Sequence, residues 1–209
     1  MTTIAEPLTF VRHPDPVVVE ADEPAAISTE PRSTNRSSRI GDVLFRSAAS
    51  APMWLVVRVW LGYEWLAAGL DKLHAPSAAS WFGDAPALVG FVHGADASWA
   101  SRAKAFGHPA VHYAWFLNFL HFIADHAWLF GPIVVFSELL IGLGLITGLL
   151  TRWAAIGGLA LNVMYIMGGS AGVNGVFMLL SMLLICAWRV SGNIGGDGVV
   201  RKLRVGTLH

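Results

Sequence analysis

Charged residues are scarce in this chain, and most of them lie near its two ends. Only 13% of the 209 residues are charged and 55% are hydrophobic, whereas soluble domains carry about 25% charged residues. The charges collect in the first 46 residues and near the C-terminus. A middle region so poor in charge is typical of an integral membrane protein.

Cysteine is nearly absent as well, because Cys186 is the only one in the sequence. A single thiol excludes an internal disulfide, a CxxC pair and an iron–sulfur cluster held by this chain alone. The apolar segments contain no histidine, which excludes a heme held by two histidines within the bilayer. GNIGGDG at 192–198 follows an apolar segment and indicates a helix stop, not a dinucleotide loop. We therefore expect no heme, flavin, iron–sulfur cluster or metal in this chain. We expect no nucleic acid partner either, because no basic patch alternates with exposed aromatics.

Four apolar segments predict membrane-spanning helices, at about 53–70, 128–150, 153–169 and 173–190. A span needs about 20 residues, so the first and the fourth are at the short end. The expected fold class is an all-α integral membrane protein, a bundle of four transmembrane helices within residues 47–192. Residues 1–46 are polar and predict a disordered cytoplasmic tail. Residues 193–209 predict a basic cytoplasmic tail, and no cleaved signal peptide is expected.

Basic residues predict the orientation of these helices, since they collect on the cytoplasmic side of membrane proteins. They occur before the first predicted span, between the second and third, and after the fourth: Arg36, Arg39, Arg46, Arg152, Arg201, Lys202 and Arg204. The expectation is a multi-pass protein of the cell membrane with both termini in the cytoplasm.

The stretch 74–127 is predicted to be a long outer loop between the first two spans. Asn118, His121 and Asp125 recur at i, i+3 and i+7, which places them on one helical face. This pattern favours an amphipathic helix at the outer membrane interface. A fifth span is the alternative, but it would place the basic C-terminus outside.

Each predicted span carries a polar group near its middle. Glu64 lies in the first, Glu138 in the second, Asn162 in the third and Ser181 in the fourth. Charged groups at this depth cost at least about 2.5–3.5 kcal/mol, so they usually pair or serve a function. Arg58 is the expected partner. It could pair with Glu138 on a neighbouring helix or with Glu64 on the same helix. These groups either lock the bundle through hydrogen bonds or form a functional pocket in which an excess carboxylic acid exchanges protons.

Three stretches carry a resemblance to a known family: RVWLGYEWLAAGLDKL at 58–73, SELLIGLGLITGLLTRWAAIGG at 137–158, and the last apolar segment, which ends near SGNIGGDG. They resemble the DoxX/DoxD family, most closely the DoxD-like membrane subunit of thiosulfate:quinone oxidoreductase. The ordered set that carries the resemblance is Arg58, Gly69, Lys72, Glu138 and Asn174. The resemblance implies a four-helix bundle in a bacterial or archaeal cell membrane. It also implies oxidation of thiosulfate, or a related small sulfur compound, with electrons passed to membrane quinone.

Two functions follow from these observations, and the sequence leaves enzymatic activity open. The first is a membrane subunit of a quinone-linked oxidoreductase, with quinone as substrate or bound ligand. Its candidate catalytic residues are Glu138, Glu64 and Arg58; its candidate quinone-binding residues are Trp65, Asn162 and Tyr165; further candidates are Lys72, Asn174, His121 and Asp125. The alternative is a non-catalytic membrane anchor or assembly subunit of a larger respiratory or redox complex. The expected partners are the lipid bilayer, membrane quinone and other subunits of such a complex.

Overall fold

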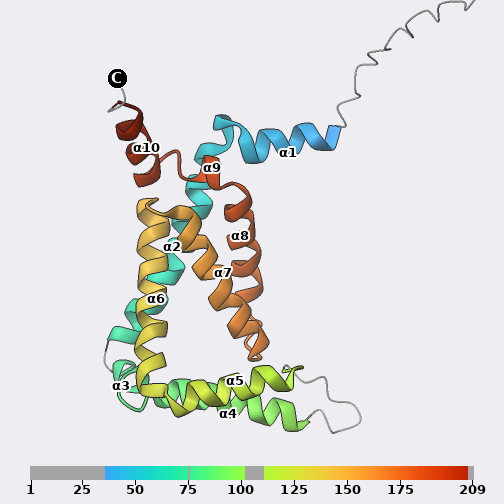
Figure 1. Ribbon diagram of the computed structural model, residues 1–209, viewed down its shortest axis with the longest axis vertical. Coiled ribbons are helices and arrows are strands. Elements are labelled where there is room, and N and C mark those ends of the chain that lie inside the picture. The colour runs from blue at the N-terminus through green and yellow to red at the C-terminus, as the bar shows by residue number, and fades with distance from the viewer. Residues whose placement is uncertain (1–35, 75, 102–110, 207–209) are drawn as a thin grey trace, which may run out of the picture. The chain divides into compact units, whose positions relative to one another are not determined.

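The computed structural model describes residues 36–74, 76–101 and 111–206, and their regular structure is entirely helical, as the sequence predicts. Figure 1 labels the helices. In chain order they are α1 (Arg36–Arg46), the 3-10 turn η1 (Ala48–Ser50), α2 (Ala51–Leu73), α3 (Ala78–Trp81), α4 (Pro86–Ser101), α5 (Ala114–Asp125), α6 (Ala127–Thr147), α7 (Thr151–Met167), α8 (Asn174–Cys186), α9 (Trp188–Ser191) and α10 (Gly196–Gly206).

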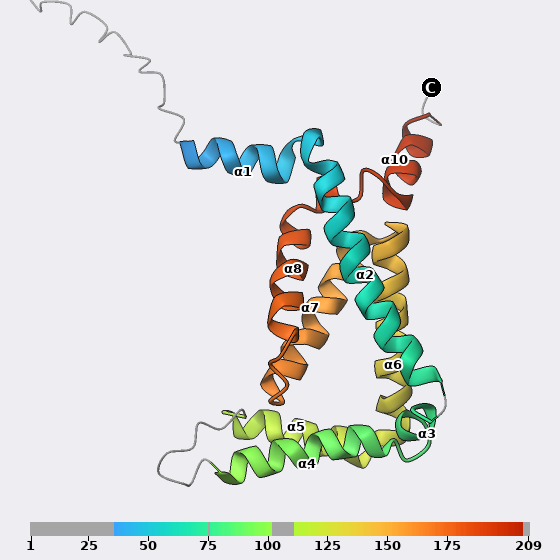
Figure 2. The same ribbon diagram turned by 180° about the vertical axis from the view of Figure 1, so that it is seen from behind.

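Four of these helices, α2, α6, α7 and α8, occupy the positions of the four predicted spans and pack together. Helix α6 contacts α2 and α7, and α8 contacts α7 and α2 (Figures 1 and 2). Large apolar side chains fill the space between them, including Leu61, Trp65, Leu145 and Leu184. Burial of this shared core holds the four helices together.

Helices α2 and α6 approach each other closely because glycine lies at their contact. A Cβ atom on Gly142 would come 2.6 Å from the backbone nitrogen of Leu66, and one on Gly62 would come 2.9 Å from Cβ of Leu145. Small residues at such crossings let membrane helices approach backbone to backbone. The close contact aligns the last turns of α2 with the middle of α6.

The bundle helices differ in whether their length and apolar composition would let them cross a membrane. Within the described residues, α6 alone is long and apolar enough to cross a membrane unaided. Helix α2 meets the same test only together with residues 40–46 of α1, from which it is bent by 66°. Helix α8 is apolar but shorter.

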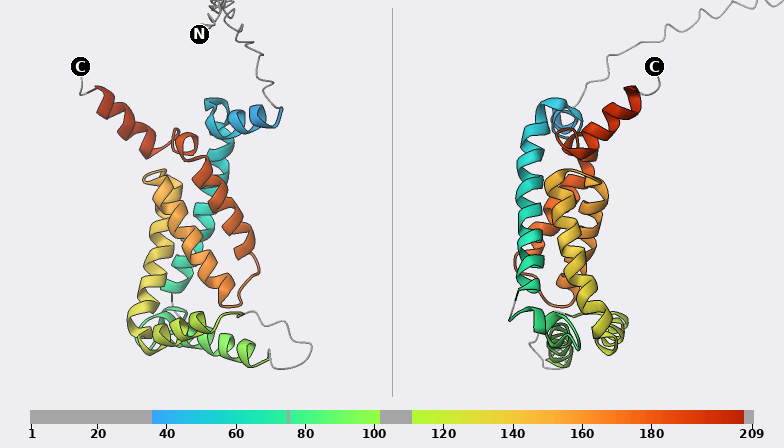
Figure 3. Two further views of the ribbon diagram at one scale, coloured as in Figure 1. Left: turned by 45° about the vertical axis from the view of Figure 1, so that its right-hand side comes forward. Right: turned by 90° about the vertical axis from the view of Figure 1, so that its left-hand side faces the viewer.

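A second layer lies across one end of this bundle, formed by α4 and α5 (Figures 1 and 3). The two helices pack through a separate apolar cluster that includes Val92, Phe116, Leu120 and Ile123. The prediction of a helix in this stretch is confirmed by α5, but the predicted loop contains α3 and α4 as well. A helix of 12 residues such as α5 is too short for a fifth span, which needs about 17 residues or more.

The prediction of disorder before residue 47 is wrong for residues 36–46, which form α1; residues 1–35 lie outside the described part of the chain. Leu44 and Phe45 pack against the bundle core, and the Trp54 indole donates a 2.7 Å hydrogen bond to the Leu44 carbonyl. The predicted C-terminal tail also contains a helix, α10. Both segments carry apolar residues at helical spacing among their charges, and this local periodicity outweighs their polar composition.

Candidate functional site

Glu138 binds two side chains that come from two other helices. Its side chain, on α6, is only 2% exposed. The Lys72 ammonium, on α2, lies 2.8 Å from Oε2, and the Tyr165 hydroxyl, on α7, donates a 2.9 Å hydrogen bond to Oε1. Both carboxylate oxygens of the buried acid are therefore bound.

Lys72 reaches this acid from the last turn of α2. Its ammonium lies 3.4 Å from the Ala68 carbonyl oxygen and 5.0 Å from the centre of the Trp81 ring. A cation is stabilised both at a helix C-terminus and over an aromatic face. The predicted first span ends at residue 70, two residues before Lys72, so Lys72 was not expected to be the partner of Glu138. The signal was its position seven residues after Trp65, which puts both on one face of a longer helix.

The predicted pair between Arg58 and Glu138 is wrong. The Arg58 guanidinium donates hydrogen bonds of 2.9 and 2.8 Å to the carbonyl oxygens of Ser191 and Ile194. It also lies against Gly148, where any Cβ would collide with it. Arg58 and Lys72 are 14 residues apart on α2, or about 21 Å along the helix axis. Lys72 therefore reaches the level of Glu138, and Arg58 lies at the other end of the bundle.

Glu138, Lys72 and Tyr165 form a triad, and the other predicted residues within the bundle lie apart from it. Glu64 is half-buried and forms no hydrogen bond or ion pair with any described residue. Trp65, Asn162 and Ser181 are buried, and their polar side-chain atoms have no hydrogen-bond partner among the described residues. A Cβ on Gly158 would lie 3.3 Å from the Trp65 indole nitrogen and 3.5 Å from the Ser181 hydroxyl. Buried polar atoms are usually satisfied by protein or ordered water, so this cluster can bind water or a small polar group.

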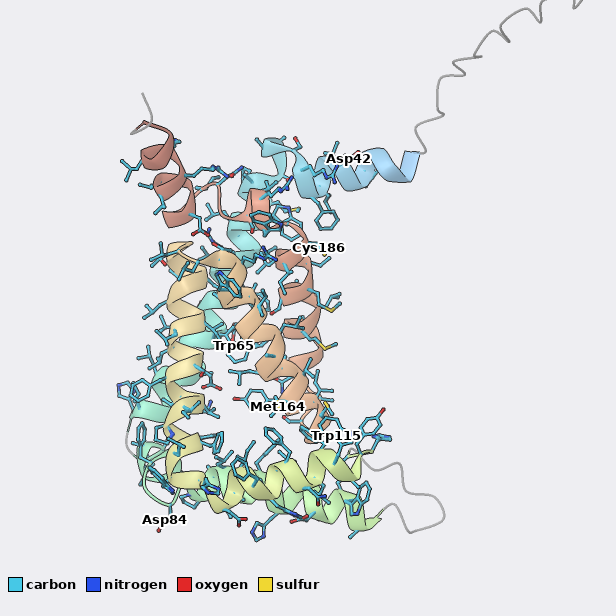
Figure 4. All side chains as sticks on the ribbon, in the orientation of Figure 1. Asp42, Trp65, Asp84, Trp115, Met164 and Cys186 are labelled. Atoms are coloured by element: carbon cyan, nitrogen blue, oxygen red, sulfur yellow. The ribbon has the colours of Figure 1, made fainter. Side chains whose placement is uncertain are left out.

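An apolar cavity of about 390 Å³ lies between the α4–α5 layer and helices α6 and α7. Phe91, Phe119, Phe130 and Met164 line it, together with Tyr165. Figure 4 shows Met164 at the end of α7 that faces the layer. Of the three predicted quinone-binding residues, only Tyr165 lines this cavity; Trp65 and Asn162 do not. Tyr165 therefore connects the cavity to the buried ion pair.

The remaining candidates lie outside this site. His121 pairs with Asp96 of α4, its Nε2 2.7 Å from the carboxylate, and Asp125 is not part of that contact. Asn174 donates a 2.7 Å hydrogen bond to the Ser170 carbonyl at the start of α8. Within the described residues no three His, Cys, Asp or Glu side chains are grouped as metal ligands. His121 and Asp125 are exposed and Asn174 is half-buried, and none of the three contacts Glu138.

Comparison with protein families identifies the chain. The family model for DoxX matches residues 53–185, from the first turn of α2 to the last turn of α8. The chain belongs to the DoxX family. No curated protein and no solved structure matches it significantly. As a DoxX protein it is a membrane protein of the DoxX/DoxD type, and Lys72, Glu138 and Tyr165 all lie within the matched region.

Proposed function

We propose that this DoxX protein is the membrane subunit of a quinone-linked oxidoreductase and that its apolar cavity binds the quinone. The proposal rests on Tyr165, which belongs both to the cavity wall and to the hydrogen bonds of Glu138. Its ring lines the cavity, and its hydroxyl donates to the buried Glu138. One side chain thus joins a site for an apolar ring to a pair of proton-exchanging groups.

The size and lining of the cavity suit the head of a quinone. Ligand pockets measure about 300–1,000 Å³ and have apolar walls with a few polar groups that orient the ligand. This cavity measures about 390 Å³ and is lined by aromatic and aliphatic side chains, with Tyr165 as a polar one. It lies between α4 and α5 on one side and α6 and α7 on the other.

The triad supplies the protons that quinone reduction requires. A quinone that accepts two electrons also takes up two protons to become a quinol. In this proposal the Tyr165 ring lies against the quinone, and its hydroxyl exchanges protons with Glu138, which accepts its hydrogen bond and pairs with Lys72. By resemblance to DoxD-like subunits, the electrons come from two thiosulfate ions that couple to tetrathionate, directly or through a partner subunit.

The helix lengths support a four-span arrangement in the cell membrane. Helix α2 has 23 residues and α7 has 17, or about 35 and 26 Å at 1.5 Å per residue, against about 30 Å of hydrocarbon. Helix α8 has only 13 residues and reaches the length of a span together with α9, which follows it after Ala187. We propose that α2, α6, α7 and α8 cross the bilayer with both termini cytoplasmic, and that α4 and α5 lie along its outer surface.

Binding of a short-chain benzoquinone to the purified protein in detergent tests the proposal. Tyr165→Phe and Glu138→Gln should each weaken binding about tenfold, because a lost hydrogen bond costs about 1.4 kcal/mol. Tyr63→Phe is the matched control, since the Tyr63 side chain is 61% exposed on α2 and far from the cavity wall. Equal affinity of the wild type, Tyr165→Phe and Glu138→Gln proteins would overturn the proposal.

A second candidate is a non-catalytic anchor or assembly subunit of a larger redox complex. The exposed aromatic side chains of Tyr113 and Trp115 at the start of α5 favour it, since exposed aromatics are common in protein interfaces. Purification in mild detergent separates the two functions. Quinone extracted from the chain alone supports the first, and stoichiometric partner subunits without bound quinone support the second.

A further inference from the structure

A second cavity, of about 540 Å³, lies at the end of the bundle away from α4 and α5. Residues from the turn between α6 and α7, from the start of α7, from α9 and from α10 line it. Three arginines line it, each from a different helix: Arg152 from α7, Arg189 from α9 and Arg201 from α10. Segments distant in sequence thus bring three positive charges to one cavity.

Contacts within the chain hold these arginines in place without neutralising them. The guanidinium carbons of Arg152 and Arg189 lie 5.2 and 5.3 Å from the centre of the Trp188 ring. Arg201 donates a 2.6 Å hydrogen bond to the side-chain oxygen of Asn193. None of the three forms an ion pair with a carboxylate of the described residues. Their charges therefore remain available to an anion.

Asp197 also lines the cavity, but its carboxylate is already bound. It accepts hydrogen bonds of 2.8 and 2.9 Å from the backbone nitrogens of Leu150 and Thr151. It also interacts electrostatically with the buried Arg58 on its inner side. The cavity consequently carries three arginine charges and one carboxylate, whose two oxygens already accept backbone hydrogen bonds.

We propose that this cavity binds the phosphate of an anionic phospholipid. Guanidinium groups bind phosphate through paired hydrogen bonds, and basic pockets at the cytoplasmic ends of membrane helices suit anionic headgroups. Leu150 and Trp153 line the same cavity and are exposed, so they offer apolar contact to the lipid beyond its phosphate. A free phosphate ion uses the same guanidiniums but gains nothing from those two side chains.

Binding of phosphatidylglycerol to the purified full chain in neutral detergent tests this proposal. Phosphatidylglycerol should raise the melting temperature, and phosphatidylcholine should not. The double variant Arg152→Gln/Arg189→Gln should weaken phosphatidylglycerol binding about 30-fold, which is about 2 kcal/mol or about 1 kcal/mol per arginine. Arg46→Gln is the matched control, because Arg46 is an exposed arginine of α1 that pairs with Asp42 outside the cavity. If the double variant does not fold, Arg201→Gln replaces it, with an expected loss of about fivefold.

Three outcomes would overturn the proposal. Equal effects of the two lipids would show that no anionic headgroup is recognised. An equal loss in Arg46→Gln would show only diffuse attraction to a basic surface. A rise in melting temperature that inorganic phosphate reproduces in full would assign the cavity to the free ion instead of the lipid.

Discussion

The buried Glu138 is held in an apolar helix by Lys72 and Tyr165, which come from two other helices. A buried ion pair is costly to form, and its stability depends on both partners, because removing one leaves a charge without compensation. The geometry gives Glu138 one cation and one hydroxyl, so the excess acid that the sequence suggested is absent from this triad.

Lys72→Met should lower the free energy of unfolding by about 3 kcal/mol, because it leaves Glu138 buried without a counterion. The double variant Lys72→Met/Glu138→Leu should recover most of that loss, since two apolar side chains replace the pair. Unfolding in detergent measures both. Lys202→Met, an exposed lysine of α10, is the control and should change little. A double variant no more stable than Lys72→Met alone would contradict the pairing.

At the level of elements, the contact between α2 and α6 sets the position of the triad. Gly142→Ala should destabilise the protein by about 1–3 kcal/mol, the usual cost of overpacking. The new methyl group would meet the backbone of α2 at Leu66. Gly90→Ala on α4 is the control, because its Cβ would meet nothing within 4 Å, and alanine favours a helix over glycine. Thermal unfolding of both variants checks this, and an unchanged melting temperature for Gly142→Ala would refute it.

Sequence patterns predicted the long helices well and the short ones poorly. Long apolar runs are strong signals for helices that share a core, so the four bundle helices lie where they were expected. Helix α4 was missed because PALVGFVHGADASWAS has few polar residues to mark a face. Helix α1 was missed because its overall composition is polar, although Leu44 and Phe45 dock on the core. Local composition does not show which side chains a neighbouring element covers.

The candidate site was predicted only in part, for a reason that belongs to tertiary structure. Tyr165 and Glu138 were both predicted as site residues. Lys72, the cation that pairs with Glu138, was only a minor candidate, and Arg58 was predicted in its place. Helical spacing shows which residues share a face of one helix. It does not show the vertical offset between two helices, which decides whether the residue at 58 or at 72 lies level with 138. That offset comes from the glycine contacts between α2 and α6.

The whole molecule allows a test of the proposed topology. In a Cys186→Ser background, a cysteine at Ala97 on α4 should react with a membrane-impermeant maleimide only from outside the cell. A cysteine at Val199 on α10 should react only from the cytoplasmic side, because α4 and α10 lie at opposite ends of the bundle (Figure 1). Both positions are exposed, so accessibility within the protein does not limit the reaction. Labelling of the Ala97 position from the cytoplasm would reverse or refute the topology.

The hydrogen bonds of Arg58 connect the fold to the order in which the chain is synthesised. Its acceptors, the carbonyls of Ser191 and Ile194, follow it by 133 and 136 residues. Until the ribosome has added those residues, the guanidinium has neither of these two acceptors. A chain that stops before Ser191 therefore leaves the charge of Arg58, which is buried in the complete fold, without either acceptor.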